Sequence, residues 1–331
     1  MEMPPVIQRN PMGQPKLSLE AHKQGWRKAK EHTSSDPRNP DFSHYISASY
    51  DDILAEMDRL LREVPLQCGF APDEWNPMAG CSIPKKEDVL RIEKMRTICL
   101  MDSQYNMNNK WYGREFMTHN EALGTIPEEQ SGSRKGHRAD EVALKKVLAM
   151  DLLRQFRRAG FLCSNDAIQC YDRIVHNVAM LSMLRLGADK KALQSLFGQL
   201  QQAEHSIMTG FGLSDLKYGG HERARRGLLP LQGVMQGNGM GPIIWLAISV
   251  VLIGIMHSMG FGAVFWAAIS AAQIQMCGFT FVDDSDLLQA PPDVHTSALE
   301  ALPRFQEAVD CWKGACGPPA ETSNQKNHSG T

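Results

Sequence analysis

The feature that most constrains the fold of this chain is a long stretch without charge. Between Gly239 and Cys277 the sequence contains no Asp, Glu, Lys or Arg, so this part must lie in a protein core or in a membrane. The segment HSMGFG divides it into two apolar pieces, 242–256 and 263–276, of about 15 residues each, a length more typical of buried core helices than of membrane spans. We therefore expect core helices and no membrane association; a small membrane protein anchored by this stretch is the alternative.

Length and composition leave the class of protein open. The 331 residues are enough for one large domain or two, and 43% of them are hydrophobic. A net charge of −2 argues against a uniformly basic surface for binding polyanions. However, residues 134–158 are rich in Lys and Arg, and residues 283–310 are acidic. These stretches could face one cleft that holds nucleic acid and metal, or they could be two ordinary solvated helix faces.

The eight cysteines form no CxxC pair and no zinc-type spacing with His. No secretory signal is recognisable at the N-terminus, so we expect reduced thiols and an intracellular protein, nuclear or cytoplasmic.

Local patterns predict a mixture of helices and strands. Residues 1–48, rich in Pro, Lys, Asn and Ser, should have little fixed structure. A stripe of Ile53, Leu54, Met57, Leu60, Leu61 and Val64 predicts an amphipathic helix from Ser49 to Val64, ended by Pro65. A strand pair is expected within 89–101, helices over 140–160, 171–187 and 193–207, and a short buried strand over 161–166. In the helix over 171–187, the side chains of Ile174, Val178, Leu181 and Leu184 should face inward.

Three short motifs carry the chemistry. An apolar strand runs into Asp166 and is followed by an aromatic residue in NDAIQCYD; a glycine-rich loop, QGNGMGP at 236–242, opens an apolar helix; and FVDD at 281–284 predicts a β-hairpin with Asp283 and Asp284 at its turn. Each motif alone has an ordinary structural explanation as a turn or a helix cap. Together, carboxylates on two neighbouring strands can share two divalent cations, which prefer oxygen ligands and catalyse in-line phosphoryl displacement.

The order of these motifs resembles the reverse transcriptase domain of non-LTR, LINE-like retrotransposons. DAIQCYD resembles the first catalytic motif of that family, GVMQGNGMGPIIW its QG…P motif, and FVDD its aromatic-x-Asp-Asp motif. Upstream, PDEWNPMAGCSIPKK with EKMRTICLM resembles its Trp…Ile-Pro-Lys…Arg-x-Ile finger segment, and EEQSGSRKG resembles the segment that precedes the first catalytic motif. The resemblance covers about residues 70–326, and it implies an α+β right-hand polymerase: palm and fingers, with an antiparallel palm sheet backed by the helices 171–187 and 242–256.

The resemblance also implies a role for individual residues. Asp166, Asp283 and Asp284 would be the catalytic carboxylates, binding two Mg²⁺ or Mn²⁺ ions with the help of the Ala167 carbonyl. Tyr171 would lie beneath the incoming sugar and exclude a 2′-hydroxyl. Nucleotide, template and phosphate contacts would come from Gln236, Gly237, Lys85, Lys86 and Arg96, and nucleic-acid phosphate contacts from Arg134 and Lys135.

The implied function is RNA-templated DNA synthesis, with an RNA template, a DNA or RNA primer and dNTPs as partners. The divisions would be a low-order segment over 1–48, a helix and fingers over 49–160, a palm over 161–326 and a tail over 327–331. The thumb that follows in the family is absent or truncated, so a fragment of a retrotransposon polyprotein is expected. The alternatives are an RNA-templated RNA polymerase, which Tyr171 disfavours, and a catalytically inactive, element-derived remnant that binds nucleic acid.

Overall fold

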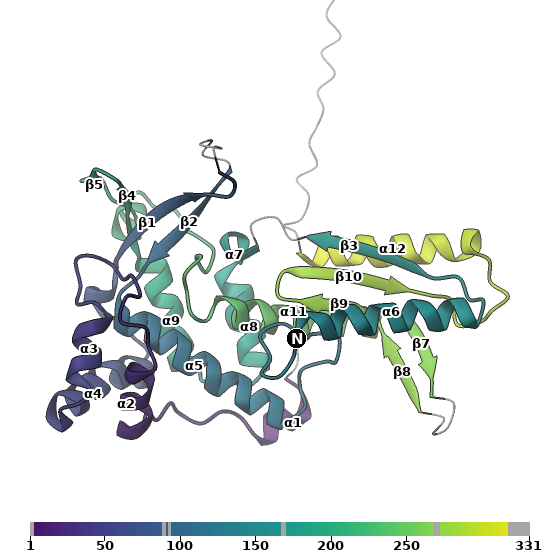
Figure 1. Cartoon of the computed structure of the whole chain (residues 1–331), viewed down its shortest axis with the longest axis horizontal. Helices are drawn as coiled ribbons and strands as arrows, with labels where there is room; N and C mark the ends of the chain where they lie inside the picture. Colours follow the sequence, from purple (N-terminus) through teal and green to yellow (C-terminus); the bar gives the residue numbers. More distant parts are fainter. Residues whose placement is uncertain are drawn as a thin grey trace, which may run out of the picture. The chain divides into compact units, whose positions relative to one another are not determined.

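The computed structural model describes residues 3–87, 91, 94–166, 170–267, 270 and 272–316. It is a mixed α+β structure with two compact units. The first consists of Met1–Ile126 and Ile168–Ile248, the second of Pro127–Ala167 and Ser249–Thr331 (Figure 1). These units do not follow the expected division at residue 160. The stretch from Pro127 belongs with the strand that bears Asp166, and residues 168–248 belong with the N-terminal part. The expected tail over 327–331 and Ala167 lie outside the described residues.

The N-terminal segment of the first unit is helical, contrary to the expectation of low order over 1–48. It forms α1 (Pro5–Arg9), α2 (Leu19–Arg27) and α3 (Phe42–Ala48). Trp26 and Phe42 are buried and pack edge-to-face with ring centroids 5.8 Å apart. Ser18 and Asp41 cap α2 and α3 through their side chains. The prediction of low order rested on the polar composition of this segment and overlooked its few large aromatic side chains. Burial of these side chains stabilises the short helices.

The next helix, α4 (Asp52–Cys68), differs from its prediction at both ends. Asp51, not Ser49, is its N-cap, and Pro65 is buried inside it instead of ending it. The helix ends at Gly69, whose φ of 81° is left-handed. A proline lacks one backbone donor, and here the packing of the helix outweighs that loss.

The apolar stripe of α4 is exposed, and its polar face is buried. Exposed side chains are Ile53, Leu54, Met57, Leu60, Leu61 and Val64. On the opposite face, the Trp26 indole donates to Asp58 at 2.8 Å, and Arg62 Nε donates to Asn108 Oδ1 at 2.9 Å. Burial of these charged groups is tolerated because they are hydrogen-bonded.

The first unit also contains a five-stranded sheet and further helices. Its order is β2 (Met95–Leu100), β1 (Pro77–Pro84), β4 (Glu204–Thr209) and β5 (Gly212–Leu213), with β6 (Tyr218–Gly219) also paired to β4. β1 and β4 are parallel, and the other pairs are antiparallel. The helices are α5 (Ser103–Ala122), α7 (Cys170–Arg173), α8 (His176–Arg185), α9 (Lys190–Gln202) and α10 (Gly220–Arg225), and a 3₁₀ turn spans Asp73–Trp75.

Three predictions for this unit are corrected. The strand expected within 89–101 is β2, but its partner is β1; residues 88–90, 92 and 93 lie outside the described residues. The helix expected over 193–207 ends at Gln202, because the next residues pair with β1 as strand β4. The helix expected over 171–187 is interrupted, and Val178 and Leu181 are exposed instead of facing inward.

The interruption between α7 and α8 coincides with contacts from a segment distant in sequence. The carbonyls of Tyr171 and Ile174 accept hydrogen bonds from Val234 N and Gly233 N, both at 2.8 Å. The residues that lead into the glycine-rich loop thus satisfy two backbone acceptors where the helix is interrupted.

The second unit is built on a three-stranded antiparallel sheet in the order β3 (Phe161–Asp166), β10 (Asp284–Gln289) and β9 (Gly278–Phe281) (Figure 1). On one face, α6 (Ala139–Gln155) packs its buried Val142, Ala149 and Leu153 against Phe279 and Leu288. On the other, Phe305 of α12 (Ala298–Cys316) stacks on Phe161 at 5.0 Å. The helix expected over 171–187, which was to back this sheet, belongs to the first unit as α8. The helix that does pack on the sheet, α6, was expected in the fingers.

The charge-free stretch folds in two different ways. Its first half forms α11 (Gly241–Ser258), which crosses the boundary between the units. Among the described helices, α11 alone is long and apolar enough to cross a membrane, and 67% of it is buried within the protein, as in a core helix. Its second half is not the expected helix. It forms the hairpin strands β7 (Ala263–Trp266) and β8 (Gln273–Met276), since apolar length alone does not distinguish strand from helix.

Candidate active site

The FVDD segment forms the predicted hairpin between β9 and β10. Phe281 pairs with Asp284, leaving Val282 and Asp283 as a two-residue turn. Val282 has a φ of 56°, which is the left-handed conformation that tight hairpin turns require. The apolar residues of β9 therefore pair with β10, and the carboxylates Asp283 and Asp284 follow directly after β9.

The strand β3 brings Asp166 to this same end. In the antiparallel ladder, Asp166 pairs directly with Asp284, and the pairing continues from there to Phe161 and Gln289. Directly opposed residues in such a ladder have Cα atoms about 4.5–5.5 Å apart. Residues 118 positions apart in the chain, one from each acidic motif, thus meet at the end of one ladder.

These residues have the chemistry that Mg²⁺ requires. Asp284 is exposed and Asp283 half-buried, and within the described part of the chain neither carboxylate takes part in an ion pair. Two anionic oxygen groups with room for water and substrate phosphate fit the coordination that Mg²⁺ adopts at phosphoryl-transfer sites. Asp283 and Asp284 could hold such ions. Asp166 joins them through its backbone pairing with Asp284; the side chain of Asp166 and all of Ala167 lie outside the described part of the chain.

The third carboxylate of the hairpin, Asp286, has a different environment. It accepts a hydrogen bond from Lys146 Nζ of α6 at 2.5 Å and another from the hydroxyl of Ser164. Its position two residues along β10 puts it opposite Ser164, two pairs in from the end of the ladder. Asp286 therefore ties the sheet to α6.

The loop with the sequence EEQSGSRKG borders the hairpin. Thr280 N of β9 donates to Glu129 O at 2.8 Å, and Ser131 N donates to Thr280 O at 3.0 Å. A Cβ atom added to Gly132 would collide with the backbone of Val282, so only glycine allows this approach. The loop fixes the turn that carries Asp283; the glycine was the available signal, but its partner could not be read from the sequence.

Buried Gln130 holds this loop in place. Its Nε2 donates to Ser249 Oγ at 2.6 Å, and its Oε1 accepts from Gly132 N at 2.8 Å. Arg134, predicted to bind nucleic acid, donates to the Gln130 carbonyl at 3.0 Å and is half-buried. Lys135 is exposed. Of these two cations, Lys135 is the one the structure leaves open to solvent.

Most other cations of the basic stretch are paired locally. Lys145 lies near Glu128, Arg154 near Asp151 and Arg138 near Asp140, each within ion-pair distance. Arg158 donates to the carbonyls of Val264 and Pro291. This pattern favours solvated helix faces and structural contacts over a continuous phosphate-binding surface.

In the first unit, the glycine-rich loop runs beside β2. Cys99 N donates to Gln236 O at 2.8 Å, and Gln236 forms a parallel bridge with Ile98. Gly237 has a φ of 108°, and a Cβ there would lie 2.6 Å from the Cys99 carbonyl oxygen. Asn106 of α5 fastens the same loop, donating to Gly237 O at 3.2 Å. The backbone of both predicted loop residues, Gln236 and Gly237, is thus hydrogen-bonded next to the strand that carries Arg96.

The predicted phosphate-binding cations lie on the β1–β2 hairpin. Arg96 pairs with Ile83 across the hairpin, and Lys85 N donates to Lys94 O at 3.1 Å. The side chains of Lys85, Lys86 and Arg96 are all exposed. Each of the three cations is therefore accessible to an anion from solvent.

Tyr171 lies on α7, next to the start of α11. Its ring is 3.6 Å from the position a Cβ would take on Gly241, and the side chain is half-buried. Its neighbour Asp172 has its pKa raised by burial, and the charge of Lys85 opposes that shift. Lys85 is therefore within electrostatic range of α7, and the first unit gathers Tyr171, the glycine-rich loop and the basic hairpin.

No protein-family model matches the chain, and the search of curated proteins finds no match. The placement of the motifs within the two units is therefore the basis for a proposed function.

Proposed function

We propose that this chain is an RNA-directed DNA polymerase that transfers nucleotides with two Mg²⁺ ions held by Asp166, Asp283 and Asp284. The observation that supports the proposal is the pairing of Asp166 with Asp284 at the end of the β3–β10 ladder. In a polymerase palm, one carboxylate is expected at the end of a strand, beside a two-residue hairpin turn that carries further carboxylates. The second unit would then contain the palm sheet.

For the metal ions, the chemistry supplied would be activation of a primer hydroxyl and stabilisation of the leaving pyrophosphate oxygen. The carboxylates hold the ions, and the loop at Gly132 keeps the turn in place. In the first unit, the exposed Lys85, Lys86 and Arg96 are suited to a triphosphate. Tyr171 is proposed to select deoxynucleotides. The fingers of the enzyme would include this β1–β2 hairpin.

Primer extension tests the proposal. The purified chain would receive an RNA template, an annealed DNA primer, dNTPs and Mg²⁺, in parallel with the double variant Asp283→Asn, Asp284→Asn. Extension by the wild type alone is expected. If a parallel reaction with ribonucleotides in place of dNTPs extends the primer faster than the reaction with dNTPs, the chain is an RNA polymerase instead. Template binding with no extension by either protein would favour a remnant that binds nucleic acid without catalysis.

A further inference from the structure

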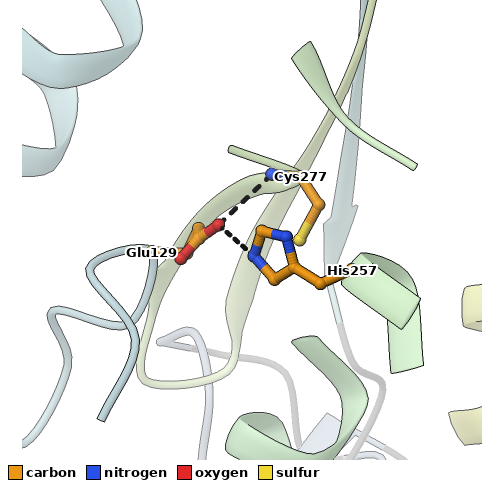
Figure 2. A group of neighbouring side chains, drawn as sticks. All are labelled: Glu129, His257 and Cys277. Carbon is orange, nitrogen blue, oxygen red and sulfur yellow. Dashed lines mark hydrogen bonds and ion pairs between the residues drawn. The ribbon is translucent and has the colours of Figure 1, made fainter. Parts of the chain in front are cut away.

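The side chains of Glu129, His257 and Cys277 converge in the second unit, away from the turn at Asp283. They come from the loop before α6, the last turn of α11 and the residue before β9, as Figure 2 shows. Their ligand atoms, one from each, all lie within 4.8 Å of one another. Three separate segments thus bring a carboxylate, an imidazole and a thiol to one point.

The three groups are largely enclosed. Glu129 is 4% exposed and Cys277 1% exposed, whereas the His257 side chain keeps 30% of its surface. Glu129 Oε1 lies 2.7 Å from His257 Nε2 and accepts a hydrogen bond from Cys277 N at 3.3 Å. The site is built by buried groups and is open to solvent on the histidine side.

We propose that Glu129, His257 and Cys277 bind one Zn²⁺ ion, with water or an outside group as the fourth ligand. Oxygen, nitrogen and sulfur donors together suit Zn²⁺, whereas Mg²⁺ takes oxygen alone. In a tetrahedral zinc site, ligand atoms are separated by about 3.3–3.7 Å. The present distances, 2.7 Å between Glu129 Oε1 and His257 Nε2 and at most 4.8 Å within the cluster, lie on either side of that spacing.

Charge balance supports a dication at this point. With the Cys277 thiol deprotonated, its proton having passed to solvent, and His257 neutral, the carboxylate and the thiolate carry two negative charges. Zn²⁺ cancels both, so the complex buries no net charge. The competing arrangement is a protonated His257 paired with Glu129 alone, which leaves the buried thiol without a role.

The proposed ion would join the loop to the hairpin. The Glu129 main-chain carbonyl accepts hydrogen bonds from both the amide and the hydroxyl of Thr280 in β9. Cys277 precedes that strand directly. Binding of Zn²⁺ would therefore add a second link between the same two segments, and it should raise the thermal stability of the chain whether or not the chain catalyses anything.

Metal titration of the full chain tests this site directly. Co²⁺ would be added to the reduced, metal-free protein and then displaced by Zn²⁺. We expect one equivalent of Co²⁺ with a thiolate-to-cobalt charge-transfer band and tetrahedral visible absorption, unaffected by excess Mg²⁺. A wild-type protein with no such band, or with only octahedral cobalt spectra, would overturn the proposal without the use of any variant.

Two variants assign the ligands. Cys277→Ser should abolish the charge-transfer band, and Glu129→Gln should weaken Zn²⁺ binding at least about tenfold. The matched control is Cys99→Ser, which removes another buried thiol and should leave the band unchanged. Loss of the band in Cys99→Ser but not in Cys277→Ser would place the metal elsewhere. If Zn²⁺ raised the melting temperature of folded Glu129→Gln by as much as that of the wild type, the assignment of Glu129 as a ligand would likewise be contradicted.

Discussion

Asp166 and Asp284 are paired directly across the antiparallel ladder of β3 and β10, at the end where the hairpin turns. Asp283 lies in the turn, directly before Asp284. Asp286 lies two residues after Asp284 in β10 and is hydrogen-bonded to Lys146 and Ser164. The acidic segment therefore contains carboxylates in two different environments. We propose that those at the end of the ladder bind metal ions, whereas Asp286, inside the ladder, is hydrogen-bonded to α6 and β3.

The structural role of Asp286 predicts coupling with Lys146. The pair is partly buried, with side chains 16% and 33% exposed, so a double-mutant cycle with Asp286→Asn and Lys146→Met should give a coupling energy of about 1 kcal/mol. Chemical denaturation of the four proteins measures it. Additive effects of the two substitutions would mean that the ion pair does not form in solution.

Gly132 should be intolerant of any side chain. Alanine at this position collides with the Val282 backbone, so Gly132→Ala should lower the free energy of unfolding by about 1–3 kcal/mol and reduce primer extension by displacing the turn. Gly254→Ala is the control, because a Cβ there meets nothing and alanine favours the interior of α11. Equal stability of Gly132→Ala and wild type would show that the loop does not approach the turn so closely.

Tyr171 should control the choice of sugar. Replacement by valine removes the ring that is proposed to exclude a 2′-hydroxyl, so the ratio of ribonucleotide to deoxynucleotide incorporation should rise at least about tenfold. Steady-state incorporation of each nucleotide by wild type and Tyr171→Val measures the ratio. The exposed Tyr50 offers a control, Tyr50→Val, that should leave selectivity unchanged. An unaltered ratio in Tyr171→Val would assign the ring to packing alone.

Buried His205 should make the protein sensitive to acid. It is 4% exposed and stacks on Tyr218 at 5.1 Å, and burial lowers its pKa to about 4. A histidine whose pKa is lower in the folded state than its usual value near 6.5 contributes stability that is present above pH 6.5 and is lost as pH falls toward 4. The loss from this residue is on the order of 3 kcal/mol.

The substitution His205→Phe keeps a ring in that place and removes the titration. The difference in unfolding free energy between pH 7 and pH 4.5 should therefore be smaller in His205→Phe than in wild type, as measured by urea denaturation at each pH. His32→Phe, at an exposed position, should behave like wild type. A wild-type pH dependence in His205→Phe would show that other groups cause the acid sensitivity.

The parts of the fold that sequence could predict are those determined by neighbouring residues. Strand β3, the hairpin at FVDD and the helix after the glycine-rich loop each follow from short patterns of apolar residues and turns. The hairpin at β7–β8 could not be predicted, because its apolar residues suit either secondary structure until strand pairing decides. The exposed stripe of α4 was also missed, since the buried partners of Asp58 and Arg62 are distant in sequence.

The same limit applies to the candidate site. The two acidic motifs could be recognised separately, but the register that pairs Asp166 with Asp284 is a tertiary property. Gly132 likewise approaches Val282, and Glu129 meets His257 and Cys277, across more than 100 residues of sequence. No local pattern encodes these contacts.

The central claim is tested most directly by comparing Asp284→Asn with Asp286→Asn in single-turnover primer extension with Mg²⁺. The two substitutions remove the same charge from the same strand, two residues apart. Asp284→Asn should slow extension at least about 100-fold with primer–template affinity unchanged, whereas Asp286→Asn should remain within a few fold of wild type once it is folded. Equal rates for the two variants would contradict the assignment of the ladder end as the metal site.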